Sequence, residues 1–154
     1  MYTAVLFLHS LLRWVVLVLA AVAIVRATRG LSSGRPFSRA DDKAGLFFMI
    51  SLDVQLLLGL LLYFALSPIT GAALSGFGAA MKDRTLRFWA VEHGFMMLLG
   101  IALVHVGRVA VRRAEDDKSK HKKALVFYAL GTLLVLAGIP WPFLPYGRAL
   151  LALP

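Results

Sequence analysis

Residues 88–111 have the sequence FWAVEHGFMMLLGIALVHVGRVAV. This stretch matches the roughly 20 predominantly apolar residues that an α-helix needs to cross a lipid bilayer. Three further apolar blocks of similar length lie at residues 3–25, 44–66 and 124–144. The sequence therefore predicts an all-α integral membrane protein, a four-helix bundle of up-down-up-down topology that forms a single transmembrane domain over residues 1–154.

The composition supports lipid as the main solvent. The chain is 60% hydrophobic, with a mean hydropathy of +0.78, which is well above an ordinary soluble domain. A secretory signal peptide is the competing interpretation of the first block, because Ala21-Val22-Ala23 has the pattern of a cleavage site. No basic residue precedes that block, so a true span is favoured. The chain has no Cys, which excludes disulfides, thiolate metal sites and iron–sulfur clusters held by its own side chains.

The net charge of +9 comes from Lys and Arg residues in the connections between the apolar blocks. Cytoplasmic loops carry an excess of such residues. We therefore expect residues 26–43 and 108–123 to be cytoplasmic and both termini to lie outside. This placement makes the bilayer the expected partner and excludes nucleic acid, with anionic lipid headgroups as a secondary ligand of the basic face.

Ionisable side chains within the apolar blocks cost a few kcal/mol each in hydrocarbon, so each is a functional hypothesis. They are His9 and Arg13 in the first block, Asp53 in the second, and Glu92, His93 and His105 in the third. The first and third helices run parallel in the predicted bundle, and His9 and His93 each lie about five residues into their helix. We expect the two imidazoles at one depth, where they can ligate a single haem iron from opposite faces.

His93 shares a helix face with several small residues. That face also carries Met97, Gly100, Val104 and Gly107. The glycines would let either a flat macrocycle or another helix approach closely, and the sequence leaves both interpretations open.

His105 lies about 18 Å deeper along the same helix than His93, so the two cannot share a metal. Its candidate partners are Asp53 and His121. A hydrogen bond between His105 and a carboxylate is favoured over a second haem.

Arg13 lies one turn from His9, where it can pair with Glu92 or with a haem propionate. Glu92 can alternatively orient the imidazole of a ligating histidine. The remaining interpretation is an ion-pair network that only sets the register of the helices.

Four short stretches carry a family resemblance: HSLLRW at residues 9–14, QLLLGL at 55–60, RFWAVEH at 87–93 and IPWPF at 139–143. They resemble a family of small bacterial four-helix membrane proteins labelled cytochrome b-like, and the likeness covers nearly the whole chain. The resemblance implies a haem b bundle reminiscent of the b561 type, in the bacterial inner (plasma) membrane. It also implies a His at position 53, where this chain has Asp53, and that departure argues against a second haem.

We therefore expect one haem b, with His9 and His93 as the metal ligands. The further cofactor-binding candidates are Arg13, Glu92, Gly100 and His105. No catalytic side chain is predicted, because the reaction would belong to the cofactor. The leading hypothesis is one-electron transfer, with quinol as a candidate partner; whether the protein is an enzyme, such as a quinone-linked oxidoreductase, is left open.

Two alternatives remain. The protein can be a non-catalytic subunit of a larger respiratory or photosynthetic membrane complex, or a homo-oligomer, with its buried polar groups serving helix register. It can also be a small transporter with Glu92 or Asp53 taking protons, or a copper-handling protein. The copper ligands would be His9, His93, Met96 and Met97.

Overall fold

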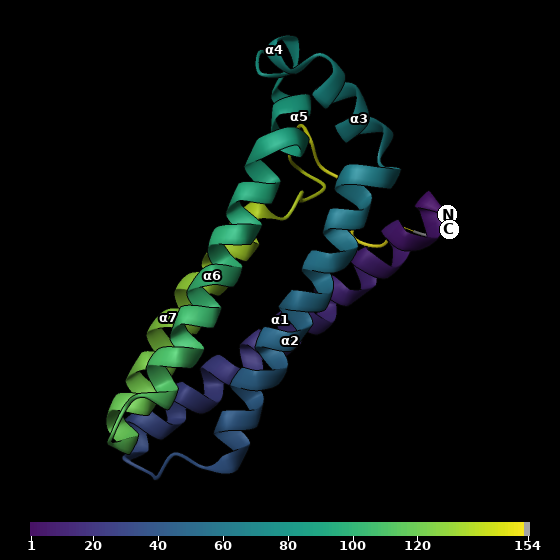
Figure 1. Ribbon diagram of the computed structural model, residues 1–154. Coiled ribbons are helices and arrows are strands. Elements are labelled where there is room, and N and C mark those ends of the chain that lie inside the picture. The colour runs from purple at the N-terminus through teal and green to yellow at the C-terminus, as the bar shows by residue number, and fades with distance from the viewer. Residues whose placement is uncertain (153–154) are drawn as a thin grey trace.

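The computed structural model describes residues 1–152, and within them it contains four long helices and no strand. All four are long and apolar enough to cross a membrane, which confirms the predicted all-α, four-helix architecture (Figure 1). The long helices are α1 (Tyr2–Ser33), α2 (Arg39–Leu61), α6 (His93–Arg112) and α7 (Asp117–Gly138). The shorter helices are η1 (Leu62–Leu66), α3 (Pro68–Ser75), α4 (Phe77–Ala80), α5 (Arg84–Arg87) and η2 (Phe88–Glu92).

Successive long helices run in opposite directions, so both chain ends lie at the same end of the bundle (Figure 1). We call this the terminal end; it also holds residues 67–87 and the segment that follows α7. The opposite, hairpin end holds the two short connections at residues 34–38 and 113–116. Helix α1 packs against α2 and α7, and α6 packs mainly against α7, whereas α2 and α6 share a smaller interface.

Local signals in the sequence set the helix ends. Helix α1 ends at Gly34, which has a φ of 65°, a conformation that glycine adopts without steric cost. Helix α2 begins with a capping box, in which Ser38 and Asp41 each bind the other's backbone N–H. Asp116 caps α7 by accepting a hydrogen bond from the backbone N of Ser119 at 2.8 Å.

Two expected boundaries differ from the structure. The fourth helix ends at Gly138 and not at residue 144, because Pro140 lacks the N–H that would continue the helical ladder. The expected connections at residues 26–43 and 108–123 are mostly helical, since α1 continues to Ser33, α2 begins at Arg39, α6 continues to Arg112 and α7 begins at Asp117. The basic side chains of these regions therefore project from helix ends rather than from long loops.

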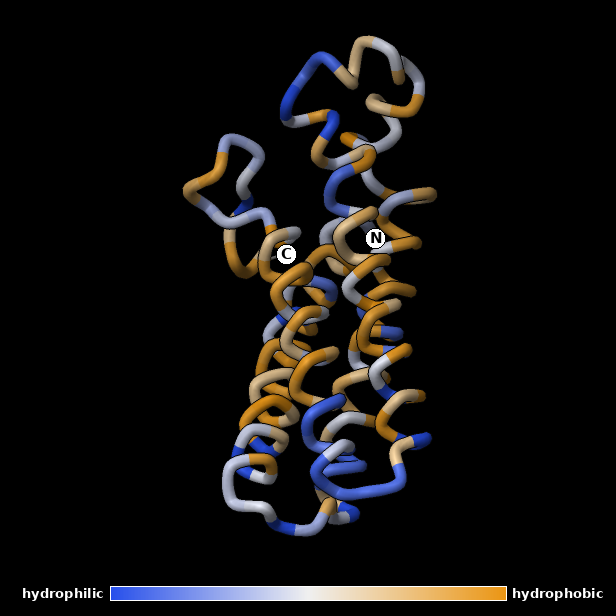
Figure 2. The backbone as a smooth tube through the Cα atoms, turned by 90° about the vertical axis from the view of Figure 1, so that its left-hand side faces the viewer, coloured by the Kyte–Doolittle hydropathy of each residue, from blue (hydrophilic) through white to orange (hydrophobic). Residues whose placement is uncertain are grey.

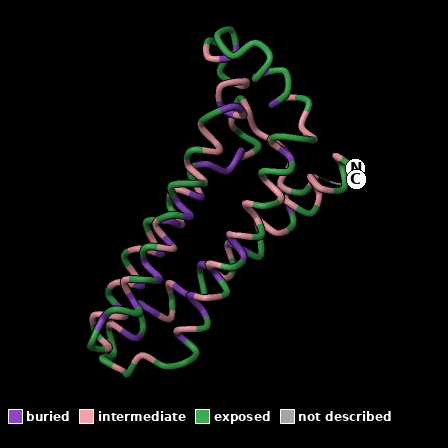
Figure 3. Tube along the Cα trace, in the orientation of Figure 1, coloured by how far each residue is buried: buried purple, intermediate pink, exposed green. Residues whose placement is uncertain are grey.

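The interior combines small residues such as Ala20 with a few large ones such as Phe48 and Leu52, and many large apolar residues lie outside. Buried positions face the neighbouring helices, and exposed positions cover the outer surface (Figure 3). Leu57 and Phe64, for example, have exposed fractions of 66% and 74%. The tube coloured by hydropathy is apolar along the middle of the helices and polar mainly towards the ends (Figure 2). This distribution suits a hydrocarbon solvent, in which an exposed leucine or phenylalanine costs nothing.

Close approach of α6 and α7 depends on glycine. A Cβ atom at Gly100 would lie 3.0 Å from the carbonyl oxygen of Gly131, and one at Gly107 would overlap Cβ of Phe127. The two backbones therefore meet directly, which maximises dispersion contacts where burial of apolar surface gives no gain.

Charged groups are buried at the hairpin end. Arg108 is only 4% exposed and donates two hydrogen bonds to Asp42, at 2.6 and 2.9 Å. Asp41 accepts from both Arg26 and Arg35, and this hydrogen bonding raises the pKa of the Arg35 guanidinium above its ordinary value. These pairs tie α2 to α6 and to the end of α1.

His121 joins the same region to α7. It is fully buried, and its Nε2 donates to the carbonyl oxygen of Arg35 at 3.2 Å. Its ring lies against Phe37 and over Gly30, where any Cβ would clash with it. His121 is thus part of the packing between the first connection and α7.

The substitution Gly107→Ala should weaken the α6–α7 interface, because the new Cβ would overlap Cβ of Phe127, which cannot rotate away. We expect the free energy of unfolding to fall by about 1–3 kcal/mol, measured by SDS or thermal unfolding followed by circular dichroism. Gly94→Ala is the matched control, since nothing lies within 4 Å of its added Cβ and Ala is a better helix former than Gly. Equal stability of the two variants would contradict the packing.

Candidate functional site

His93 is held in a defined orientation at the terminal end. It begins α6 directly after the π-helical segment η2, and such segments occur frequently at functional sites. Its Nδ1 lies 2.8 Å from the carbonyl oxygen of Gly138. Since a carbonyl can only accept, Nδ1 carries the proton and Nε2 keeps a free lone pair. This is the tautomer and the backbone partner that metal-ligating histidines commonly have.

Aromatic rings enclose the same imidazole. The ring of His93 lies 5.8 Å from that of Phe88 and 5.6 Å from that of Trp89, between centroids. Tyr146, from the segment after α7, stacks on Phe88 at 3.7 Å. These contacts restrict the rotation of the His93 ring.

His9 lies on α1, against α2. A Cβ added at Gly59 would lie 3.3 Å from Cε1 of His9, so the glycine leaves room for the imidazole. Gln55 donates from Nε2 to the carbonyl oxygen of His9 at 3.0 Å. The common depth of His9 and His93 stays a prediction.

Unsatisfied polar atoms gather at this place. Of the five buried side-chain atoms that have no hydrogen-bond partner within residues 1–152, three belong to His9, Arg13 and Gln55. The atoms are Nδ1, Nε and Oε1 respectively, and the other two are Nε of Arg108 and Nδ1 of His121 at the hairpin end. A buried polar group without a partner costs about 1–3 kcal/mol, and a cluster of them calls for an explanation, of which a missing ligand is one.

The donor set suits haem. Two imidazoles are common axial ligands of haem iron, and a guanidinium can bind a propionate carboxylate. Arg13 lies one turn from His9 on α1. The residues present at the terminal end therefore fit the predicted cofactor.

The segment after α7 turns back along the terminal end of the bundle (Figure 1). Arg13 donates to the carbonyl oxygen of Leu150, and the backbone N of Ala152 donates to Oγ of Ser10 at 3.2 Å. The guanidinium of Arg148 lies 4.3 Å from the ring centroid of Trp89. Residues 148–152 thus contact α1 and η2 near the two histidines, and the IPWPF stretch lies beyond the end of α7.

Two suggested contacts do not form. Glu92 accepts a hydrogen bond from Arg87 at 2.7 Å and not from Arg13. The imidazole of His93 is oriented by the carbonyl of Gly138 and not by Glu92. Glu92 is therefore part of a local ion pair at the start of the third long helix.

Gly100 lies in the α6–α7 interface, directly against the backbone of Gly131. Of the two interpretations of the glycine face, close helix packing is the one that this position supports. Gly107 packs on Phe127 in the same way.

His105 pairs with Asp53 across the α2–α6 interface, as the favoured interpretation predicts. Nε2 of His105 lies 2.8 Å from Oδ1 of Asp53. Their side chains are 44% and 41% exposed, although apolar positions surround them on both helices. His121, the other candidate partner, binds the backbone of Arg35 instead.

Sequence reasoning missed several residues of this end. Gln55, Gly59 and Gly138 each contact one of the two histidines. Tyr63 donates from its hydroxyl to the carbonyl oxygen of Ala90 at 2.7 Å, which joins η1 to η2. Gln55 could have been found from the sequence, because it is a polar side chain within an apolar block. Gly138 could not, because it binds His93 through its backbone carbonyl, and every residue has one.

Within the described residues, no group of three or more His, Cys, Asp and Glu side chains is placed to hold a metal ion. The predicted haem needs only two protein ligands. No protein-family model, curated protein or solved structure matches this chain. The cytochrome b-like resemblance therefore stays a prediction, and the function has to be argued from the site itself.

The pair of Asp53 and His105 can be tested by a double-mutant cycle with Asp53→Leu, His105→Leu and the double variant. Each single change should cost stability, because it leaves the other partner without its hydrogen bond. We expect a coupling energy of about 0.6–1.7 kcal/mol, the range for hydrogen bonds between membrane helices, from SDS unfolding in mixed micelles. Additive effects of the two single changes would show that the pair contributes nothing.

Proposed function

We propose that the protein is an integral membrane cytochrome that binds one haem b between His9 and His93 and passes single electrons. The observation that carries the proposal is the cluster of unpartnered buried polar atoms on His9, Arg13 and Gln55, next to an imidazole whose Nδ1 is already bound. Quinol is a candidate electron donor. The wider setting proposed is a bacterial inner membrane.

Each residue has a role in this proposal. His93 would ligate through Nε2, because Gly138 fixes its proton on Nδ1. His9 would be the second ligand, and Arg13 would neutralise a carboxylate beside it. When bound, haem b would supply a one-electron couple. The segment after α7 would exclude water from the two imidazoles, and lower polarity around a redox group shifts its potential.

The orientation in the membrane is also a proposal. The hairpin end carries the basic residues of α1, α2, α6 and α7, and the positive-inside rule places such an end in the cytoplasm. The terminal end, with its histidines and both chain ends, would then face outward. An acceptor or donor on that side would exchange electrons with the site.

A reduced-minus-oxidised visible spectrum of the purified protein tests the haem. We expect a b-type absorption band that is lost in His93→Ala and in His9→Ala, since each variant removes an axial ligand. His105→Ala should keep the band, because its partner is Asp53. A colourless but folded protein from cells supplied with haem would reject the proposal.

A second set of variants separates loss of haem from loss of fold. Gly59→Val should reduce the band by crowding the His9 imidazole, with a helical circular dichroism spectrum that remains normal. Gly94→Val, at an open position of α6, is its control. Equal haem content in the two variants would argue against His9 as a ligand.

The absence of Cys allows the orientation to be tested by single cysteines. Ser75→Cys at the terminal end and Ser33→Cys at the hairpin end are both exposed positions. In intact cells, a membrane-impermeant maleimide should label Ser75→Cys, and it should label Ser33→Cys only after permeabilisation. The reverse pattern would place the basic end outside.

A second candidate function is that of a non-catalytic subunit of a larger membrane complex. The half-exposed pair of His105 and Asp53 favours it, because polar side chains that face lipid are costly and a partner helix would cover them. The spectrum described above discriminates the two functions: a folded protein without haem would make this the leading one.

A further inference from the structure

The hairpin end contains an open hollow of about 370 Å³ where α2 begins, α6 ends and α7 begins. Its apolar lining comes from Phe37 and from Val111, which is almost completely buried. Its basic lining comes from Arg39, Arg112 and Lys120, one from each of the three helices. Residues far apart in the sequence are thus brought to one place with apolar and cationic groups side by side.

The cations of this hollow are largely uncommitted. Arg39 and Arg112 are exposed and form no ion pair within the described residues. Lys120 lies 3.8 Å from Asp117, a loose contact. The one acidic residue of the lining, Asp42, is already bound by both terminal nitrogens of Arg108. A site with spare positive charge therefore remains.

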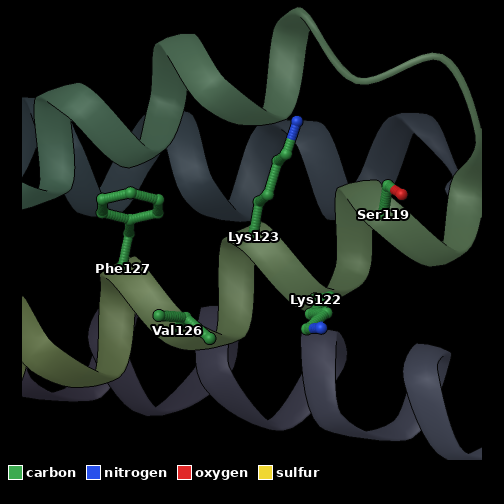
Figure 4. Close-up of a pocket in the computed structure, with 5 residues that line it drawn as sticks. All are labelled: Ser119, Lys122, Lys123, Val126 and Phe127. Atoms are coloured by element: carbon green, nitrogen blue, oxygen red, sulfur yellow. The ribbon is translucent and has the colours of Figure 1, made fainter.

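A second hollow of similar size lies on α7 and repeats the combination. Lys122 and Lys123 line it together with Val126 and Phe127. Figure 4 shows the side chains of Lys123 and Phe127 projecting next to one another from the helix. Basic side chains above apolar ones are therefore a property of this whole end of the bundle.

We propose that the hollow lined by Arg39, Arg112 and Lys120 binds the phosphate of an anionic phospholipid. The apolar spans end at this level, where the headgroups of a bilayer begin. Phosphate would contact the three cations, and the glycerol and upper acyl carbons would lie on Phe37 and Val111. Basic pockets between helices at the cytoplasmic side of membrane proteins bind lipid headgroups in this way.

The alternative is that these basic residues only direct topology. Topology depends only on the number of Lys and Arg residues near the span ends. That role does not explain why three different helices place cationic side chains around one hollow. The proposal depends on membrane insertion but not on haem. Its failure and the failure of the cytochrome proposal are therefore independent.

The test is a titration of purified protein in detergent with phosphatidylglycerol or with phosphatidylcholine, followed by native mass spectrometry. We expect preferential retention of phosphatidylglycerol. In the triple variant Arg39→Gln, Arg112→Gln, Lys120→Gln its affinity should fall by more than about tenfold, since each basic residue near a headgroup contributes about a fivefold factor.

The matched control is Arg29→Gln, Arg113→Gln, Lys118→Gln, which removes the same charge from exposed positions of the same end, outside the hollow. It should keep the affinity within about twofold, because headgroup attraction is local to the bound phosphate. An equal loss in both triple variants, or no preference between the two lipids, would overturn the proposal. If the first triple variant does not fold by circular dichroism, Arg112→Gln alone is compared with Arg113→Gln.

A separate arm distinguishes lipid from soluble phosphate. Glycerol 3-phosphate should not displace phosphatidylglycerol at equal concentration, because it lacks the acyl carbons that would contact Phe37 and Val111. Displacement at equal concentration would identify a site for soluble phosphates and overturn the lipid assignment.

Discussion

The four long helices are apolar enough to span a membrane, and the main features of the bundle suit a hydrocarbon solvent, which cannot form hydrogen bonds. A chain placed in it has to satisfy its backbone internally, which α-helices do, and it gains nothing by burying leucine rather than exposing it. The bundle therefore exposes residues such as Leu57 and Phe64, although other large side chains such as Phe48 are buried. Close packing of glycine on glycine between α6 and α7 follows from the same constraint, because dispersion and helix contact are the remaining attractive forces.

Polar side chains then serve as the specific connections between helices. At the hairpin end, Arg108 with Asp42 and His121 with the carbonyl of Arg35 join helices that are distant in the sequence. Such connections select one arrangement of the bundle, because a rotated or shifted helix would leave a buried charge without its partner. Asp53 with His105 belongs to the same class, although its half-exposed position suggests a further partner.

The terminal end is organised by segments that lie outside the four long helices. A π-helical segment lies on each side of residues 67–87, with η1 before them and η2 after them. Tyr63 of η1 joins the two segments by donating a hydrogen bond to the carbonyl oxygen of Ala90 in η2. The segment after α7 turns back over Ser10 and Arg13. Even so, His9, Arg13 and Gln55 keep buried atoms without partners. Three such atoms on neighbouring side chains, beside an imidazole whose Nδ1 is already bound, support ligand binding at the terminal end.

The sequence by itself determined the four helices, because apolar blocks of bilayer length have one stable form in lipid. It also identified His9, His93, Asp53 and His105 as unusual, since ionisable groups stand out against an apolar background. The sequence also favoured the pair of Asp53 and His105, but only the tertiary structure decided the partners of His9 and His93. His93 meets the carbonyl of Gly138, and His9 has room beside Gly59. These contacts, and the way the chain turns back after Pro140, depend on how the helices approach one another. Every residue has a backbone carbonyl, and every glycine lacks a side chain, so neither is distinctive in the sequence. Packing in three dimensions decides which carbonyl binds an imidazole and which glycine leaves room for one.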